Sequence, residues 1–162
     1  MHAPCRLGAF LRKPLILLSV LLALTGAAAP GESPQGYWLT AKKDGIIQIL
    51  RCGEMLCGRI AWFRIPPNDP NQQGLDLHNP DPARRSRPLC GLIFMSGFKA
   101  GGADSWEDGT IYDPDSGNNY HATMTLRGDG TLDLRGYIGI SLFGRSEVWT
   151  RYTEPVPTCP TR

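Results

Sequence analysis

The sequence predicts an all-β fold, a closed antiparallel meander barrel of about eight strands, with a β-sandwich as the alternative architecture. No segment after residue 28 has the apolar period of an amphipathic helix. Short runs of β-branched, aromatic and alternating residues recur instead, separated by Gly, Asp and Asn. The expected strands cover 36–42, 45–52, 56–64, 90–98, 109–112, 119–127, 131–138 and 145–152.

Two of these strands alternate clearly between apolar and polar residues. The apolar face of 119–127 consists of Tyr120, Ala122, Met124 and Leu126. That of 131–138 consists of Leu132, Leu134 and Ile138. One dry and one wet face are typical of an antiparallel sheet that curls around a single core. Closure of such a sheet removes its exposed edges, which favours a barrel.

The connections contain residues suited to tight turns. Asp44-Gly45, Gly128-Asp129-Gly130 and the segment 115–118 are each expected to supply the positive φ that a hairpin turn needs. The segment 65–88 is different because it is long and rich in proline, which rules out a central strand. We expect it to be an ordered or partly ordered loop, and loops of this length often carry a function.

The first 28 residues have the layout of a cleaved secretory signal. A basic start with Arg6, Arg12 and Lys13 precedes the apolar run 15–24. This run is shorter than the roughly 20 residues that span a bilayer, which argues against an uncleaved membrane anchor. Small residues follow, and we place the cut after Ala28.

The leader indicates an exported bacterial protein, periplasmic or secreted, with no transmembrane segment after cleavage. The predicted organisation is a signal peptide (1–28), a single barrel domain (29–154) and a flexible tail (155–162).

The charge of the chain argues against a polyanionic partner. The sequence has 17 Lys and Arg against 15 Asp and Glu, a net charge of +2. Three of the basic residues belong to the leader, so 14 basic and 15 acidic residues remain after it, a net charge of −1. The composition therefore disfavours nucleic-acid binding.

Four cysteines follow the leader, and an oxidising compartment would permit disulfides. Cys52 and Cys57 bracket four residues, a spacing that fits two strands joined by a short turn. The small loop between them limits the stabilisation from such a bridge to about 2 kcal/mol. Cys90 and Cys159 are a possible second pair, and the sequence leaves the connectivity open.

Patterns typical of metal sites are incomplete, so we expect no metal and no cofactor. A zinc site would lack a Cys-x-x-Cys pair, and His78 and His121 are the remaining soft ligands. The segment 113–118 begins like a calcium loop, but Met124 stands where the bidentate glutamate is expected. A hairpin turn is the simpler interpretation of this segment.

Catalytic patterns are similarly weak, and no catalytic residue is predicted. Glu107 and Asp108 flank turn signals, which is more typical of solvated turns than of a carboxylate pair across a cleft. Ser96 lacks the Gly-x-Ser-x-Gly context of a nucleophile elbow. His121 could act as a base, and a hydrolase of unknown substrate stays an alternative.

The two ends of the domain contain a matched pair of residues. Trp38 lies in the first expected strand and Arg151 in the last, and these strands are neighbours in a closed barrel. A guanidinium over an indole contributes roughly 0.5–2 kcal/mol. This pair would plug one end of the barrel and leave the other end open, and Gly36 would let the chain bend there.

Gly-x-Trp on the first strand with Arg on the last resembles the signature of lipocalin- and avidin-type barrels. A longer ordered series of motifs resembles the bacterial family called domain of unknown function 2147. It comprises Cys52-Gly-Glu-Met-Leu-Cys57-Gly58-Arg59-Ile60, Asn79-Pro80-Asp81-Pro82, Arg87-Pro88-Leu89, Gly91-Leu92, Ile111-Tyr112-Asp113-Pro114, Gly136-Tyr137-Ile138-Gly139, Gly144-Arg145 and Trp149-Thr150-Arg151. The resemblance implies an exported, lipocalin-like barrel and no established reaction. Cys90 departs from the aliphatic residue usual in such sequences, which puts a partner for Cys159 in doubt.

The leading functional hypothesis is a non-catalytic binder or carrier of a small hydrophobic or amphipathic ligand in the cell envelope. Aromatic side chains would line its cavity, and polar residues of the long loop would form its rim. The expected ligand-binding residues are Trp62, Phe94, Asn79, Asp81, Arg87 and Tyr112. A structural alternative is that Asp81 caps a turn and pairs with a nearby arginine. A functional alternative is a protein-interaction module that uses loop 65–88.

Overall fold

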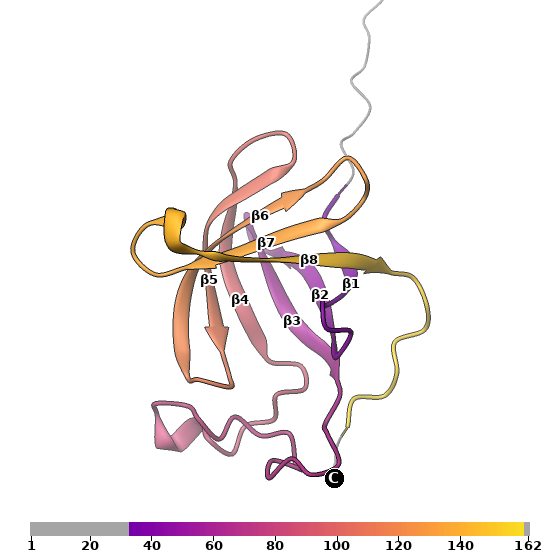
Figure 1. The fold of residues 1–162 in the computed structure, drawn as a ribbon, viewed down its shortest axis with the longest axis vertical. Helices are drawn as coiled ribbons and strands as arrows, with labels where there is room; N and C mark the ends of the chain where they lie inside the picture. The colour runs from indigo at the N-terminus through magenta and orange to yellow at the C-terminus, as the bar shows by residue number, and fades with distance from the viewer. Residues whose placement is uncertain (1–32, 161–162) are drawn as a thin grey trace, which may run out of the picture.

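Each strand pairs with the next one in the sequence, and the last strand pairs with the first. In the computed structural model, which describes residues 33–160, this order closes an antiparallel barrel (Figure 1). The strands are β1 (Gly36–Leu39), β2 (Gly45–Cys52), β3 (Met55–Phe63), β4 (Ile93–Ala100), β5 (Ser105–Asp113), β6 (Asn118–Leu126), β7 (Leu132–Tyr137) and β8 (Arg145–Tyr152). Two short 3-10 turns are η1 (Pro82–Arg84) and η2 (Ser141–Phe143). The predicted eight-stranded barrel is confirmed.

The predicted signal peptide (1–28) lies outside the described residues and stays a prediction. Within residues 33–160, no helix has the length and apolar character needed to cross a membrane.

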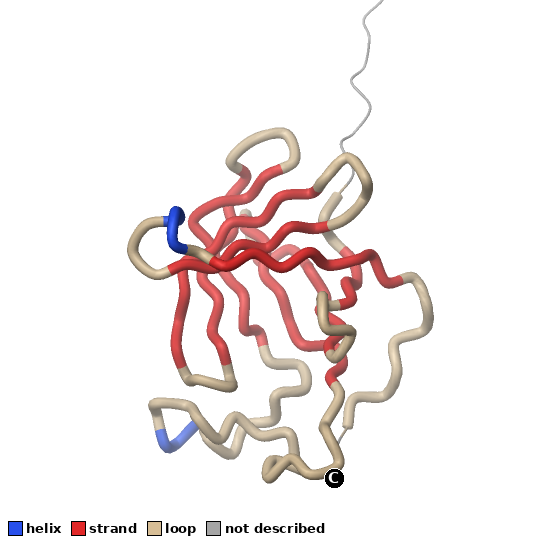
Figure 2. The backbone as a smooth tube through the Cα atoms, in the orientation of Figure 1, coloured by secondary structure: helices blue, strands red, loops and turns tan. Residues whose placement is uncertain are grey.

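The up-and-down order of the strands sorts the connections between the two ends of the barrel. The β2–β3, β4–β5 and β6–β7 turns lie at one end. The β1–β2, β3–β4, β5–β6 and β7–β8 connections lie at the other, which includes the long loop 64–92 at the bottom of Figure 2. These two ends differ in how they are filled.

Large apolar side chains fill the end that carries the β2–β3 turn. Trp38 and Leu132 are fully buried, and Phe98 is 1% exposed. Ala122, Met124 and Leu126 join them from β6, so the alternation in this strand points into the core as predicted. Ile138, expected on the same dry face of the next strand, lies beyond the end of β7 and is 71% exposed.

The first and last strands meet through Trp38 and Arg151, which are partners in the β1–β8 register. The Arg151 guanidinium lies 4.3 Å from the centre of the Trp38 ring. It also donates hydrogen bonds to the carbonyl oxygens of Ser33 and Gln35, at 2.9 and 3.0 Å. Gly36 has a φ of 123°, and a Cβ there would lie 3.2 Å from the guanidinium, so both conformation and space favour glycine.

Some strand ends differ from the prediction because of local backbone geometry. The first strand ends at Leu39, because residues 40–44 form the turn into β2. The positive φ of this turn belongs to Lys43 (58°), whereas Asp44-Gly45 was expected to supply it. Gly45 instead begins β2, with its N–H bonded to the Thr40 hydroxyl.

The largest difference concerns β5, which begins at Ser105 although the sequence predicts 109. A register shift between Trp106 and Gly109 accommodates Glu107 and Asp108, the latter with a φ of 59°. Such a β-bulge interrupts the alternation, so the acidic pair looks like a turn in the sequence. β4 also begins late, at Ile93, because Gly91 and Leu92 close a turn back to Leu89 and Ile60.

The cysteines form two bridges, Cys52–Cys57 and Cys90–Cys159, with Cα–Cα distances of 5.9 and 6.2 Å. The first joins the ends of the β2–β3 hairpin. The second ties the C-terminal segment to the end of the β3–β4 loop. Disulfides of this kind belong to oxidising compartments, which indicates a location outside the cytoplasm.

Replacement of Arg151 by methionine should lower the free energy of unfolding by about 2 kcal/mol, because it removes the ring contact and the bonds to the N-terminal segment. Arg151→Lys should recover only part of this loss, since an ammonium cannot reproduce the planar fork. Urea unfolding, monitored by tryptophan fluorescence, gives the free energy of unfolding of the unchanged protein and of both variants. Equal stability of all three proteins would contradict a closing role.

The two disulfides should differ in their contribution to stability. Loss of Cys90–Cys159 in a double serine variant opens a cross-link of sequence separation 69 and should cost roughly 4 kcal/mol. Loss of Cys52–Cys57, of separation 5, should cost roughly 2 kcal/mol. Thermal unfolding shows which double variant loses more stability. A larger loss from removal of Cys52–Cys57 would refute the loop-length argument.

Candidate functional site: an open cavity and its clasped loop

A cavity of about 880 Å³ opens at the end of the barrel opposite the packed one. All four connections at this end contribute to its mouth, through Lys42, Arg64, Asp115 and Phe143 among others. The volume lies within the range of roughly 300–1,000 Å³ typical of small-molecule sites. The barrel is therefore plugged at one end and hollow at the other.

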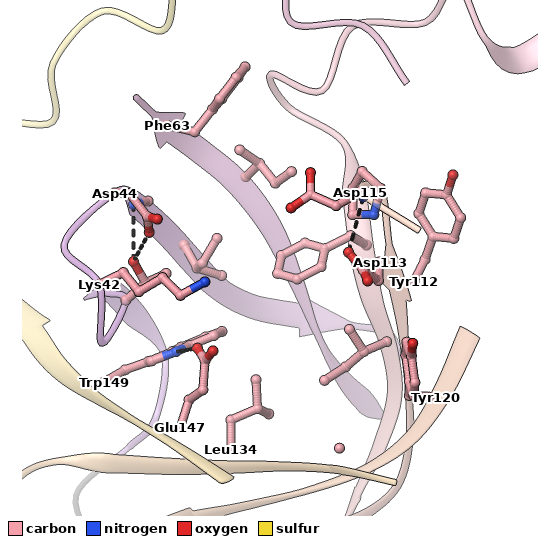
Figure 3. Close-up of a pocket in the computed structure, with 18 of the residues that line it drawn as sticks. Lys42, Asp44, Phe63, Tyr112, Asp113, Asp115, Tyr120, Leu134, Glu147 and Trp149 are labelled. Atoms are coloured by element: carbon pink, nitrogen blue, oxygen red, sulfur yellow. Dashed lines mark hydrogen bonds between the residues drawn. The ribbon is translucent and has the colours of Figure 1, made fainter. Parts of the chain in front are cut away.

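Apolar side chains make the inner part of this cavity. Ile47, Ile60, Leu134 and Trp149 reach it from four different strands, and each is at most 9% exposed. Figure 3 shows Leu134 and Trp149 rising into the space from β7 and β8. Gly136 also lines the cavity and leaves space there because it has no side chain. A Cβ on Gly136 would meet only the Tyr120 Cβ, at 3.9 Å.

Charged side chains surround the mouth. Its acidic members are Asp44, Asp113, Asp115 and Glu147, and its basic members are Lys42, Arg64 and Arg145. Asp44 accepts a hydrogen bond from the Thr40 hydroxyl at 2.8 Å, and Asp113 accepts one from Ser116 at 2.6 Å. An apolar interior with a charged mouth is complementary to a molecule with an apolar body and a polar end.

Glu147 is a charged cavity residue that the sequence analysis did not predict. Its side chain points from β8 into the cavity (Figure 3) and accepts a hydrogen bond from the Trp149 indole N–H at 3.1 Å. Residues two apart in a strand share a face. Arg145, Glu147, Trp149 and Arg151 therefore all belong to the inner face of β8, and this alternation was the available signal.

The structure divides the six predicted ligand-binding residues into two groups. Trp62 and Phe94 line the cavity and are half-buried, so they are accessible from inside the barrel. Tyr112 borders the cavity, but its ring points away from it toward the long loop (Figure 3). Asn79, Asp81 and Arg87 belong to the loop itself and are not part of the cavity lining.

A buried carboxylate, that of Asp76, holds the long loop to the barrel. It is fully buried and accepts hydrogen bonds from the Tyr112 hydroxyl (2.6 Å), the Asn79 amide (2.7 Å) and the Arg87 guanidinium (2.7 Å). The Arg87 guanidinium also lies 5.4 Å from the Tyr112 ring centre. We call Asp76, Asn79, Arg87 and Tyr112 the clasp.

The clasp sets the ionisation of its members. Burial raises the pKa of Asp76, but the hydrogen bonds from Tyr112, Asn79 and Arg87 outweigh burial, and the pKa lies below its ordinary value. Burial and the hydrogen bond to the Asp76 carboxylate raise the pKa of Tyr112. Asp76 is thus held charged and Tyr112 neutral across the whole neutral range.

The neighbouring turn fits the clasped loop closely. Gly117, in the β5–β6 turn, has a φ of 73°, and a Cβ there would lie 2.2 Å from the His78 carbonyl oxygen. Within the loop, Leu75 pairs with Pro88, and the Asp76 N–H bonds the Arg87 carbonyl. The loop is therefore an ordered wall beside the mouth.

Asp81 has a local structural role. It caps η1 by accepting a hydrogen bond from the Ala83 N–H, and it pairs with Arg84 at 3.2 Å. Both members of the pair are largely exposed. This geometry matches the structural alternative for Asp81, a turn cap paired with a nearby arginine.

The other chemical candidates lie apart from the cavity. His121 is exposed on the outer face of β6, with its ring centre 5.8 Å from that of Tyr137. Among residues 33–160, no group of three His, Cys, Asp or Glu side chains is arranged to hold a metal ion.

The family model described as "Uncharacterized protein conserved in bacteria (DUF2147)" matches residues 36–151. The chain belongs to this DUF2147 family. The matched segment runs from the glycine that starts β1 to Arg151 in β8, so it includes all eight strands of the barrel.

A solved structure, described as "Protein HP1028 from the human pathogen Helicobacter pylori belongs to the lipocalin family", is similar in fold. It superimposes with a TM-score of 0.65 at 19% sequence identity, covering 75% of this chain and 84% of that one. At this identity the similarity establishes the lipocalin-like fold alone. No curated protein matches the chain.

Replacement of Asp76 by asparagine should destabilise the protein by about 3 kcal/mol at neutral pH, because the clasp loses its charge and one acceptor oxygen. A lowered carboxyl pKa gives stability that is present above the unfolded-state pKa of about 3.9 and lost as pH falls through the folded-state value. The difference in free energy of unfolding between the unchanged protein and Asp76→Asn should therefore shrink below about pH 4. Urea unfolding at a series of acid pH values measures this difference.

Asp81→Asn on the same loop is the matched control. Its carboxylate is exposed, and asparagine can still cap the turn, so a change below about 0.5 kcal/mol is expected. A deficit for Asp76→Asn no larger than this control would contradict the clasp.

Proposed function

We propose that this DUF2147 protein binds a small hydrophobic or amphipathic molecule in its barrel cavity and acts as a non-catalytic binder or carrier. The observation that carries the proposal is the cavity itself, about 880 Å³ in volume and open at one end. Buried apolar side chains line its interior, and charged side chains ring its mouth. The lipocalin-like fold supports the same conclusion.

The chemistry of the lining supports this ligand class. Ile47, Ile60 and Leu134 offer no hydrogen bonds, so an apolar body gains free energy by leaving water. Trp62 and Phe94 add aromatic surface toward the mouth. Glu147 and Arg145 are placed to contact a polar end group. Within the proposed class, these features favour an amphipathic ligand with its polar end at the mouth.

The proposal places this activity in the bacterial cell envelope, in the periplasm or outside the cell. The two disulfides and the secretory pattern of residues 1–28 support that location.

The probe 11-(dansylamino)undecanoic acid tests the cavity, because its dansyl emission rises in an apolar environment. Gly136→Leu should weaken its binding at least tenfold without loss of stability, since the new side chain enters open space inside the barrel. Phe94→Ala should weaken binding about tenfold through lost apolar contact. Fluorescence titration gives Kd, and urea unfolding gives stability.

Gly128→Leu is the matched control for the cavity-filling variant. Gly128 lies in the β6–β7 connection at the packed end, and a Cβ there has no neighbour within 4 Å. Its probe affinity should equal that of the unchanged protein. Undiminished binding by Gly136→Leu, or absence of binding by the unchanged protein, would reject the proposal for this probe class.

A further inference from the structure

The connection between β7 and β8 exposes an unusual amount of apolar surface. Of the eight large apolar side chains described as exposed, the four most exposed belong to residues 138–143. They are Ile138 (71%), Ile140 (61%), Leu142 (76%) and Phe143 (78%). The other four range from 36% to 46% and are scattered over the barrel. Such a cluster in water marks an interaction surface.

The backbone of this loop is held in place by Arg135. Its guanidinium donates hydrogen bonds to the Ser141 carbonyl oxygen, at 2.6 and 2.9 Å, and to that of Leu142 at 3.3 Å. The loop projects from the barrel at the left of Figure 1, and η2 lies where it returns to β8. Two carbonyl groups that would resist transfer to an apolar medium are thus already bonded.

Charge around the loop favours an anionic surface. Arg135 and Arg145 flank it, and the segment 134–146 contains no acidic residue. The acidic residues contributed to the mouth by the connections lie on the β1–β2 and β5–β6 sides. Glu147, whose side chain points into the cavity, follows this segment, so two arginines and one carboxylate give the β7–β8 side a net positive charge. An apolar loop with basic residues beside it is the combination typical of attachment to an anionic lipid surface.

We infer that the loop 138–143 docks this protein onto the surface of a lipid bilayer by inserting its apolar side chains among the acyl chains near the headgroups. A protein partner fits the feature less well, because a stable interface buries roughly 800 Å² on each side, more than one short loop provides. A bilayer accepts a narrow apolar tip without matching its shape. Ile138 and Phe143 also line the cavity, so docking brings the mouth to the bilayer.

Flotation with vesicles tests this inference with the full mature chain. Vesicles of phosphatidylcholine containing phosphatidylglycerol should carry the unchanged protein, and Leu142→Gln/Phe143→Gln should lower the vesicle partition coefficient at least tenfold. Arg145→Gln should lower it about fivefold on these vesicles and little on pure phosphatidylcholine. No binding by the unchanged protein, or equal binding by the double variant, would overturn the inference.

Met55→Gln/Leu77→Gln is the matched control, because it removes two exposed apolar side chains elsewhere, 37% and 40% exposed. It should bind vesicles like the unchanged protein. Sedimentation velocity tests whether the loop instead joins two copies of the protein. A dimer that the Leu142→Gln/Phe143→Gln change dissociates, in a protein that does not bind vesicles, would assign the loop to self-association and reject the bilayer. Cavity binding of the dansyl probe is read on the unchanged protein and on Gly136→Leu, without vesicles, so either proposal can fail alone.

Discussion

The contact of Arg151 with Trp38 is the constraint on which the rest of the barrel depends. Strands β1 and β8 join through three residue pairs, against eight between β2 and β3, so backbone pairing alone holds this seam weakly. The guanidinium adds a ring contact and two bonds to the N-terminal segment. It closes the sheet and covers the indole at the packed end in the same step. A closed sheet leaves no strand edge for another chain to pair with.

Closure at one end is what allows a cavity at the other. The packed end is filled by side chains as large as Trp38 and Phe98, while inward positions toward the mouth include Gly45 and Gly136. The same strands therefore supply a packed core, which stabilises the fold, and an open cavity, which contributes no packing. The clasp adds stability on the outside of the barrel at the cavity end. There, three donors bind the Asp76 carboxylate and fix the longest connection beside the opening. Such a buried carboxylate contributes to stability only while all of its partners are in place.

The sequence predicted the strands and their order well, because alternation and turn residues are local signals. It failed where a local signal misleads. The bulge at Asp108 looks like a turn, and Lys43 has a positive φ that Gly45 appeared better suited to supply. Asn79, Arg87 and Tyr112 of the clasp were predicted as ligand-binding residues, but its centre, Asp76, was missed because its partner Tyr112 is 36 residues away. Trp62 and Phe94 were predicted because aromatic side chains were expected to line the cavity of an open barrel. Glu147 required assigning an inner face to β8 from Trp149, a step that closure of the barrel makes possible.

The mouth of the cavity is asymmetric, and this asymmetry carries physical meaning. Three of its four connections contain polar networks, centred on Asp44, on Asp113 and on the clasp. The fourth has its apolar side chains in solvent, and Arg135 stabilises that arrangement with hydrogen bonds to the loop backbone. A loop that merely joined two strands would gain stability by burying Leu142 and Phe143 in the barrel interior or by replacing them with polar residues. Its observed conformation keeps the cavity open and presents an apolar surface beside the opening.

Under the proposed docking, an amphipathic ligand that entered from the bilayer would pass along a continuous apolar path, from the acyl chains past Ile138 and Phe143 to the buried lining, without its apolar part crossing water.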